Sequence, residues 1–534
     1  MRGFFNSLTV FEKTVYVTGI LLLCLIAYVD FRWMSIGDKA WLLFSTEEWL
    51  AGKKLYVDIF EVNPPLIYWI YFLPCYLSAH LGVLTDYNFL ALLAFATLLL
   101  VLYVSHRLIQ YNPQFSHAKM QAEFCLLLAS VFMSFTNPMY FFDRDHIFLL
   151  LTFPYALRWM PSLSEAGISR SLRIAVGVMA GIGFCLKPHS MVVFAVVQAM
   201  YFLRRCSPAI LFSVENMLMY CMVFAYTAAM WVFAPDYLHT IAPMALATYG
   251  AINRKSSQAV FFFVAVIRLG VTLADFRPRY SSPYRQDIYY LLALCAAFLL
   301  YALVNNGWGY TWNPLLSLVM IVTGFVLWEF LYLTKEHSEQ GLPTRQFQFG
   351  ARACLLNLFA SVAVVLLIVY TGLVMSCGNY MDCPGGRRFM DNITRSNGGK
   401  PLQSFGTISI NADLWVYLSE KTGAPWVTRF NQVWMLPRFF IASPEFIDRN
   451  HWILDYVGRA YGEDLQRNKP ELVFVDDDED FYSVRGHVDL EKFMLDIPEF
   501  RNEWRYYRLV GRIDGVGGPS PKEHSGYFVY KRME

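Results

Sequence analysis

Ionisable residues gather in several stretches of this sequence that lie beside apolar runs. The first stretch, Asp30 to Pro65, follows an N-terminal apolar segment and contains Asp38. Apolar residues recur at helical spacing from Ile36 to Phe44, and Gly52 is a natural stop for a short helix. Asp38 is then expected in the first turn, where free backbone amides stabilise and orient a carboxylate. Both properties suit a general base, although an acid that only caps its helix shows the same pattern.

The same stretch ends with three further polar candidates. Tyr56, Asp58 and Glu61 come shortly before the pair Pro64–Pro65. A loop of this length beside a membrane helix is usually functional, because an idle connection would be shorter and richer in glycine and serine. We therefore predict that the stretch forms one wall of an active site, with these three side chains as substrate-binding residues.

A second stretch places four ionisable residues in a row, namely Asp143, Arg144, Asp145 and His146, directly before a long apolar segment. Charged groups at the mouth of a membrane helix are costly unless they are paired or face a cavity. Either the acids bind a divalent cation, with Asp143 as the metal ligand, or Arg144 neutralises one acid while the other takes part in catalysis. An Arg–Asp pair that snorkels at the membrane interface is the alternative.

Two basic sites and an aromatic turn complete the set of candidates. Lys187, in CLKPHS, follows a glycine-rich segment, and its compact charge suits a lipid phosphate, although simple snorkelling is the alternative. Arg254, with Tyr249 in ATYGAINRKSS, is a second phosphate candidate. The turn NNGWGYTWNP presents Trp308 and Tyr310, whose faces would suit a sugar ring; such residues are also expected at membrane interfaces.

The elements that must position these residues are membrane helices. Of the 534 residues, 56% are hydrophobic and only 16% charged, against about 25% charged in soluble domains. This composition indicates a polytopic α-helical membrane protein, and the net charge of +2 gives no reason to expect a nucleic-acid partner. We predict about 11 spans from apolar runs of sufficient length. They are residues 14–29, 88–107, 121–135, 146–160, 173–186, 189–204, 209–233, 258–275, 287–304, 313–333 and 351–375.

The distribution of lysine and arginine orients these runs. Basic residues mark alternate loops, which the positive-inside rule places in the cytoplasm together with the N-terminus. No cleavage site follows the first run, so we expect it to remain as an anchor. All candidate residues then fall outside the cytoplasm. The extracytoplasmic segments are 30–87, 136–145, the turn at Lys187, 234–257, 305–312 and everything after about Ser376.

One apolar segment, residues 66–84, breaks this alternation. Counting it as a span would turn the basic loops at 106–119 and 204–205 outward. We therefore predict a juxtamembrane or re-entrant helix, bent near Pro74, that stays on the extracytoplasmic side. An ordinary span that violates the rule is the alternative, and a reporter fusion at Thr85 would distinguish the two.

The composition changes after Ser376, where short β-type runs alternate with helical patterns. We predict a transmembrane domain at 1–375, with the loop 30–87, and a soluble extracytoplasmic α/β domain at 376–534. Cys377 and Cys383 would lie in an oxidising compartment, where a disulfide between them is expected; two free thiols are the alternative. The expected strands are Gly406–Ile410, Trp426–Arg429, Leu472–Val475 and Tyr527–Tyr530, and the expected helices are Asp413–Lys421 and Asp489–Leu495.

The order of these parts resembles the GT-C superfamily of membrane glycosyltransferases, close to its protein O-mannosyltransferase and lipid A aminoarabinose transferase branch. The shared pattern is an external loop with an acid, an Ala-Gly pair followed by a tyrosine and a second acid, and a Pro-Pro pair that opens the next segment. The resemblance continues through the Asp143 loop, the Lys187–Pro188 turn and the C-terminal domain. The pattern is met here by Asp38, Ala51–Gly52, Tyr56, Asp58 and Asn63–Leu66.

The resemblance implies a polyprenyl-phosphate-linked sugar donor and an inverting transfer to a hydroxyl of a cell-envelope glycan, lipid or protein. It also implies that Asp38 is the base and that Asp143 and Lys187 line one cavity near the donor phosphate. We expect the bacterial inner membrane, with a periplasmic C-terminal domain and lipids as neighbours.

Three features depart from the family pattern. The sequence DRDH and the turn GWGYTWNP do not match the aminoarabinose branch closely, and Glu61 rather than a Glu-Lys pair precedes the prolines. The sugar, the acceptor and the metal requirement therefore stay open. A secondary transporter or flippase for a lipid-linked or small polar substrate is the alternative function. Such a protein would be expected to contain two matching halves, and none is detected.

Overall fold

The computed structural model describes most of the chain. The described residues are 38–115, 118–134, 141–248, 284–304, 309–324, 384–409, 412–477, 489–514 and 526–533, with single positions between 17 and 31 and at Arg268. The predicted site residues Tyr249, Arg254, Trp308, Cys377 and Cys383 lie outside them. So do the predicted span 351–375 and nearly all of the spans 14–29 and 258–275.

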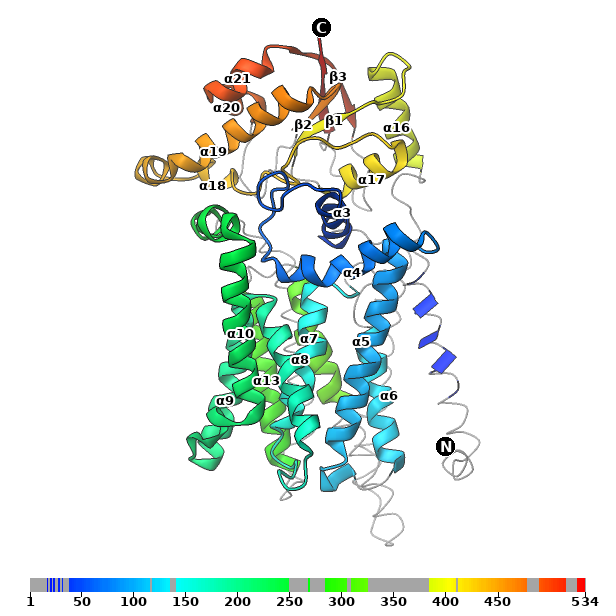
Figure 1. Ribbon diagram of the computed structural model, residues 1–534, viewed down its shortest axis with the longest axis vertical. Coiled ribbons are helices and arrows are strands. Elements are labelled where there is room, and N and C mark those ends of the chain that lie inside the picture. Colours follow the sequence, from blue (N-terminus) through cyan, green and yellow to red (C-terminus); the bar gives the residue numbers. More distant parts are fainter. Residues whose placement is uncertain are drawn as a thin grey trace. The chain divides into compact units, whose positions relative to one another are not determined.

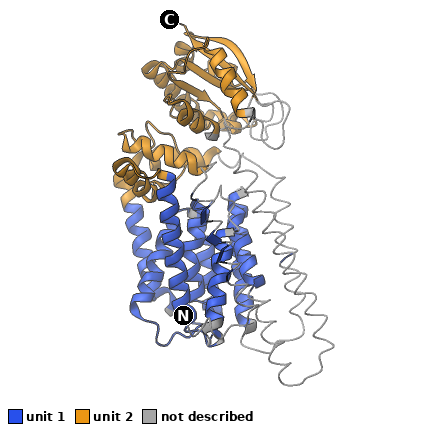
Figure 2. Cartoon of the chain, turned by 90° about the vertical axis from the view of Figure 1, so that its right-hand side faces the viewer, with its two compact units in different colours: residues 1–33, 87–228, 255–374 blue, residues 34–86, 229–254, 375–534 orange. Residues whose placement is uncertain are grey.

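The chain divides into two compact units, drawn in blue and orange in Figure 2. Unit 1 comprises residues 1–33, 87–228 and 255–374, and unit 2 comprises residues 34–86, 229–254 and 375–534. This division differs from the predicted domains, because residues 34–86 group with the C-terminal residues and not with the membrane helices. The reason is a shared hydrophobic core, described below.

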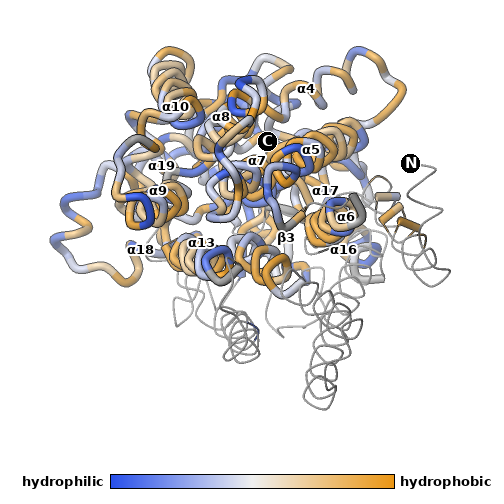
Figure 3. Tube along the Cα trace, turned by 90° about the horizontal axis from the view of Figure 1, so that it is seen from below, coloured by the Kyte–Doolittle hydropathy of each residue, from blue (hydrophilic) through white to orange (hydrophobic). Residues whose placement is uncertain are grey.

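Unit 1 is built of long helices (Figure 1). Seen end-on in Figure 3, hydrophobic residues dominate helices such as α5 and α6. Among the described residues, three helices are long and apolar enough to cross a membrane: Asp86–Ile109, Val214–Phe233 and Gln286–Val304. Residues 313–324 are also helical. The described helices include α5 (Asp86–Ile109), α6 (Ala118–Ser134), α7 (Arg144–Arg158), α8 (Arg170–Cys185), α9 (Met191–Arg205), α10 (Val214–Phe233) and α13 (Tyr284–Val304), with short turns η1 (Pro113–Phe115), η3 (Pro188–Ser190), η4 (Pro208–Phe212) and η7 (Gly309–Trp312).

Glycines let α8 approach its neighbours closely, as its sequence predicts. A Cβ on Gly183 would come within 2.7 Å of the Thr152 side chain on α7. A Cβ on Gly177 would come within 2.8 Å of the Glu215 carbonyl oxygen on α10. Larger residues would force these helices apart, so the glycines fix the position of the end of α8, from which the chain continues to Lys187.

A buried ion pair also joins these helices. Glu215 of α10 is fully buried and accepts hydrogen bonds from Arg158 of α7 at 2.9 Å and from Arg173 of α8 at 2.9 and 3.0 Å. Removal of one partner from a buried ion pair leaves an uncompensated charge and is strongly destabilising. The ion pair therefore specifies the mutual arrangement of α7, α8 and α10.

Unit 2 contains a four-stranded sheet with strand order β1-β2-β4-β3. The first two strands pair in parallel, and β4 pairs antiparallel with both β2 and β3. A parallel pair needs a long crossover, which the chain provides through helices between β1 and β2. The elements are α3 (Asp38–Leu50), α4 (Leu66–Leu81), η5 (Tyr237–Ile241), α11 (Ala242–Thr248), α16 (Pro384–Ser396), β1 (Phe405–Ile408), α17 (Ala412–Thr422), α18 (Pro437–Phe440), α19 (Pro444–Asn468), β2 (Leu472–Asp477), α20 (Leu490–Leu495), α21 (Pro498–Trp504), β3 (Tyr507–Asp514) and β4 (Gly526–Arg532).

The expected elements after Ser376 are found with two differences. Three of the four expected strands correspond to β1, β2 and β4, whereas Trp426 forms only an isolated bridge with Phe405. The strand β3 was not expected, because its sequence, YRLVGRID, shows no regular alternation of apolar and polar residues. The general prediction of a mainly helical chain with a small α/β part is confirmed; the number of spans stays a prediction.

Helix α4 covers the segment that broke the predicted alternation. It has 16 residues, and such a helix is about 24 Å long at 1.5 Å per residue, shorter than a hydrocarbon core of roughly 30 Å. It packs against α3, with Cys75 Sγ 3.9 Å from the Leu43 carbonyl oxygen. Since α7, α8 and α9 have 15, 16 and 15 residues, the length of α4 does not distinguish it from them, and the juxtamembrane or re-entrant position stays a prediction.

Candidate functional site

The start of α7 holds the four ionisable residues in a row, and all four are buried. Asp143 caps the helix, since its carboxylate accepts a hydrogen bond from the His146 amide at 2.8 Å. His146 Nδ1 in turn accepts a hydrogen bond from the Phe142 amide at 2.9 Å. A neutral His146 therefore carries its proton on Nε2. Asp143 and His146 thus fix the first turn of α7 and the direction in which its other charges project.

Asp145 pairs with Lys187, which follows α8. Lys187 Nζ donates to Asp145 Oδ2 at 2.6 Å, and both side chains are almost fully buried. The second oxygen, Oδ1, accepts a hydrogen bond from the Tyr301 hydroxyl of α13. Three helical segments of unit 1 therefore converge on one carboxylate. We call Asp143, Arg144, Asp145, Lys187, Tyr301 and Tyr310 the α7–Lys187 cluster.

Tyr310, in the turn η7, covers the cations of this cluster. Its ring centroid lies 4.8 Å from Lys187 Nζ and 5.9 Å from the Arg144 guanidinium carbon. The sequence predicts that this ring stacks on a sugar, whereas in the structure it makes cation–π contacts with two basic side chains. Tyr310 therefore helps to hold the cations, and a role in sugar binding stays a prediction.

Burial shifts the protonation of the two loop residues of the cluster. It raises the pKa of the Asp143 carboxyl, and the neighbouring Asp145 charge raises it further. Burial also lowers the pKa of Lys187, although Asp145 opposes this shift. The two shifts have one cause, because burial disfavours the charged form of an acid and of a base alike.

The role of Asp143 as a metal ligand stays a prediction. In the described residues no group of three or more His, Cys, Asp and Glu side chains is arranged to hold a metal ion. One oxygen of the Asp143 carboxylate accepts the His146 amide hydrogen bond, and both oxygens of Asp145 are engaged by Lys187 and Tyr301.

Asp38 begins helix α3 of unit 2, in the first turn predicted for it, and its side chain is exposed. An exposed carboxylate at the start of a helix is accessible to another molecule. This arrangement can accept a proton from a nearby hydroxyl. Its role as a base stays a prediction.

The other candidates of the first stretch make contacts that shape the loop. The buried Tyr56 donates through its hydroxyl to the Asn63 carbonyl oxygen at 2.8 Å. Asp58 accepts from the Lys54 amide at 3.0 Å and lies 3.4 Å from Arg467. Glu61 is also buried. The role of these three residues in substrate binding stays a prediction.

Two residues in these sites were not singled out from the sequence. Tyr301 lies in an apolar run, where a tyrosine is ordinary, and no local pattern announces its contact with Asp145. Trp41 follows Asp38 by three residues on α3, a spacing that places the two on neighbouring positions of one face. That spacing was the one signal that could have drawn attention to Trp41.

Comparisons with known proteins place these features in a known fold. No family model and no curated protein sequence matches the chain. The crystal structure of ArnT from Cupriavidus metallidurans in the apo state matches with a TM-score of 0.51 and 13% identity, over 97% of this chain and 98% of that chain. The same values hold for ArnT bound to undecaprenyl phosphate. The oligosaccharyltransferase AglB from Archaeoglobus fulgidus matches with a TM-score of 0.44 and 12% identity, over 97% of this chain and 74% of that chain.

The match to ArnT extends over nearly the whole chain, although the identity is too low to show more than the fold. ArnT is a lipid A aminoarabinose transferase and a GT-C glycosyltransferase. The resemblance predicted from the order of motifs is therefore confirmed at the level of structure: this chain has the fold of the GT-C glycosyltransferase ArnT.

Proposed function

We propose that this chain is an inverting glycosyltransferase that uses a polyprenyl-phosphate-linked sugar. It would move a hexosyl or pentosyl group to a hydroxyl of a cell-envelope glycan, lipid or protein, at the extracytoplasmic face of a bacterial inner membrane. The fold shared with ArnT, which has been crystallised bound to undecaprenyl phosphate, supports the donor class. The single observation that carries the proposal is the buried α7–Lys187 cluster, in which Lys187 and Arg144 both lie against the ring of Tyr310.

The cluster has the properties of a binding site for the donor phosphate. Lys187 is held at one end by Asp145 and against the face of Tyr310, so its ammonium has a defined position before any ligand arrives. Arg144 lies against the same ring and supplies a second charge. A phosphate that meets preorganised cations in a poorly hydrated site is bound more tightly than one at the surface, and its negative charge as a leaving group is stabilised.

Asp38 is the proposed base. The acceptor hydroxyl attacks the anomeric carbon of the sugar, forming the new glycosidic bond, while the bond between that carbon and the phosphate oxygen breaks. The electron pair of the broken bond leaves with the polyprenyl phosphate, and Asp38 takes the hydroxyl proton. A single displacement of this kind inverts the configuration at the anomeric carbon, and it needs no soluble nucleotide sugar.

The variant Asp38→Asn tests the assignment of the base. It keeps the size of the side chain but cannot take a proton, so transfer in membranes supplied with polyprenyl-phosphate sugars should fall by about 100- to 10,000-fold. Asp448→Asn, at an exposed acid near the start of α19, is the matched control and should keep full activity.

Two other outcomes would contradict the proposal. Full transfer by Asp38→Asn would remove that residue from the mechanism. Failure of the parent protein to use any hexosyl or pentosyl polyprenyl phosphate, together with uptake of a solute by reconstituted vesicles, would instead favour the transporter.

A further inference from the structure

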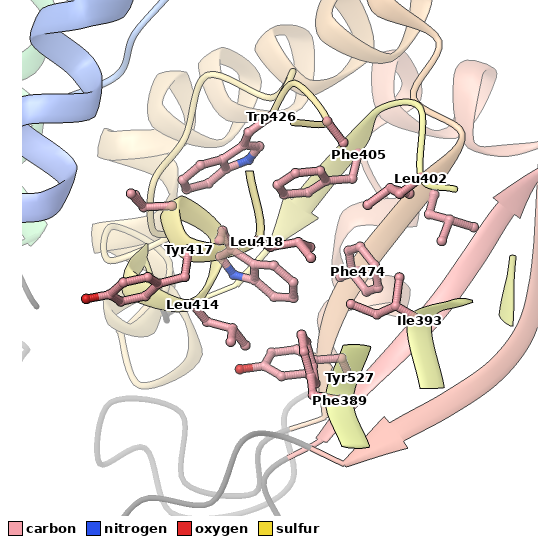
Figure 4. Packing of buried hydrophobic residues seen from close by; sticks show 14 of the residues in the cluster. Phe389, Ile393, Leu402, Phe405, Leu414, Tyr417, Leu418, Trp426, Phe474 and Tyr527 are labelled. Atoms are coloured by element: carbon pink, nitrogen blue, oxygen red, sulfur yellow. The ribbon is translucent and has the colours of Figure 1, made fainter. Parts of the chain in front are cut away.

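Helix α3, which begins at Asp38, is part of the hydrophobic core of unit 2. Its Ala40 and Trp41 are 0% and 4% exposed and belong to one buried cluster with residues of α16, α17 and the sheet. Figure 4 shows the centre of this cluster, where Phe405 of β1, Phe474 of β2 and the Trp426 ring lie among side chains of α17. The helix of the proposed base is therefore held by residues near the C-terminus.

The indole of Trp41 makes the central contact between α3 and this core. Its ring centroid lies 5.2 Å from that of Trp426, and the Trp426 ring in turn stacks on Phe405 at 6.2 Å. Phe44, one turn further along α3, packs against both tryptophans at 5.8 and 6.0 Å. Aromatic contacts of this kind fix both the position and the rotation of the helix.

A buried carboxylate orients the same indole. Trp41 Nε1 donates to Glu61 Oε2 at 2.5 Å, and Glu61 is 1% exposed. Its other oxygen accepts from the Asn63 amide at 2.9 Å and from the Asn63 side chain at 2.6 Å. Because Glu61 is fixed by Asn63, it can hold the indole in one orientation.

The segment that carries Glu61 is itself docked on the C-terminal residues. The Phe60 amide donates to the Arg429 carbonyl oxygen at 2.8 Å, and the Phe60 ring packs on Phe430 at 4.7 Å. The Arg429 side chain is held by Asp464, with nitrogen–oxygen distances between 2.8 and 3.2 Å. Both ends of the contact between Trp41 and Glu61 are therefore anchored in the same core.

We propose that Trp41 is a positioning residue for Asp38, through which the C-terminal part of unit 2 sets the place of the carboxylate. This inference rests on the proposed role of Asp38 as the base. The two residues are three positions apart on one rigid helix, so any movement of the indole is passed to the first turn. Asp38 is exposed, and the buried Trp41 lies one turn further along the same helix.

Two substitutions of Trp41 separate ring packing from hydrogen bonding. Trp41→Ala removes both contacts, and because misplacement by about 1 Å can cost 100-fold in rate, kcat should fall by that order. Trp41→Phe keeps a ring in the core but loses the bond to Glu61, and kcat should fall about fivefold. The KM for the polyprenyl-phosphate sugar should stay unchanged in both. Trp452→Ala, at a 40% exposed tryptophan of α19, is the matched control and should behave as the parent protein.

The measurement is kcat and donor KM per folded molecule, with the folded fraction taken from size-exclusion chromatography and thermal unfolding. A residue that only fills the core would lower the folded fraction and leave kcat per folded molecule unchanged, which would overturn the inference. Trp41→Phe keeps the test decisive if Trp41→Ala does not fold, since parental kcat in the folded phenylalanine variant would also overturn it.

Comparison with Asp38→Asn distinguishes the two proposals. If Asp38→Asn is inactive while both Trp41 variants keep the parental kcat, the inference about Trp41 fails and the proposed base stands. If Asp38→Asn is active, the proposed base fails, whatever the Trp41 variants do.

Discussion

The α7–Lys187 cluster and the start of α3 fix ionisable groups in opposite ways. In the cluster, Lys187 and Asp145 are buried and are held by each other and by tyrosines. At the start of α3, Asp38 is exposed, and an apolar core holds the helix behind it. A group that binds a charged ligand gains strength from a poorly hydrated site, whereas a base must stay accessible and retain its charge. The difference agrees with the separate roles proposed for the two regions, phosphate binding by the cluster and proton transfer by Asp38.

The largest expected effect comes from removing the acid of the buried Asp145–Lys187 ion pair. Asp145→Leu leaves Lys187 buried without its carboxylate, which should lower the free energy of unfolding by about 3–5 kcal/mol. Adding Lys187→Met should restore most of that loss, because an apolar pair of similar size is tolerated in place of an ion pair. Thermal unfolding of the purified single and double variants measures this. Equal stability of the two variants would show that the pair is not buried as described.

The double variant also isolates the binding role of Lys187. Folded protein with Asp145→Leu and Lys187→Met should bind polyprenyl phosphate about 10- to 100-fold more weakly, because it lacks one hydrogen bond between a charged side chain and the phosphate. Titration calorimetry with the lipid phosphate in detergent gives the affinity. Lys421→Met, on the exposed end of α17, is the control for loss of a lysine charge. Unchanged affinity in the double variant would assign the phosphate to another site.

The smallest expected effect concerns a second acid of α3. Burial, followed by the charges of Asp86 and Glu420, raises the pKa of Glu47 to about 8. The native state then holds a proton that the unfolded state releases, so the stability from this group is complete below pH 4.5 and is lost as the pH rises through 8. Because the side chain is partly exposed, solvent screening keeps the contribution below about 1 kcal/mol.

The variant Glu47→Gln should remove this dependence and flatten the stability of unit 2 between pH 5 and 8. Chemical unfolding at several pH values, followed by tryptophan fluorescence, would detect the change. A slope that persists in Glu47→Gln would assign the pH dependence to other groups.

The sequence predicts local features of these regions better than their long-range contacts. The helical start at Asp38, the glycine contacts of α8 and three of the strands follow from spacing and residue type. The pairing of Tyr301 with Asp145 does not, since a hydroxyl in an apolar run gives no sign of a partner on another helix. The same limit hid the contact between Trp41 and Trp426. The resemblance to the GT-C superfamily rests on the order of motifs. It therefore predicts a cavity shared by Asp143 and Lys187, but it does not predict the contacts of Tyr301 or Trp41.

The assembly of unit 2 from distant parts of the chain has a consequence for its synthesis. Asp58 and Arg467, which pair in the folded unit, are separated by 409 residues. At about 5–20 residues per second, a ribosome needs roughly 20–80 seconds to synthesise that interval. Helix α3 is therefore synthesised well before the C-terminal residues against which it packs. During this interval Trp41 and Phe60 are accessible to chaperones or proteases. The proposed base would thus acquire its working position only when translation is almost complete, so a truncated product would be inactive from the outset.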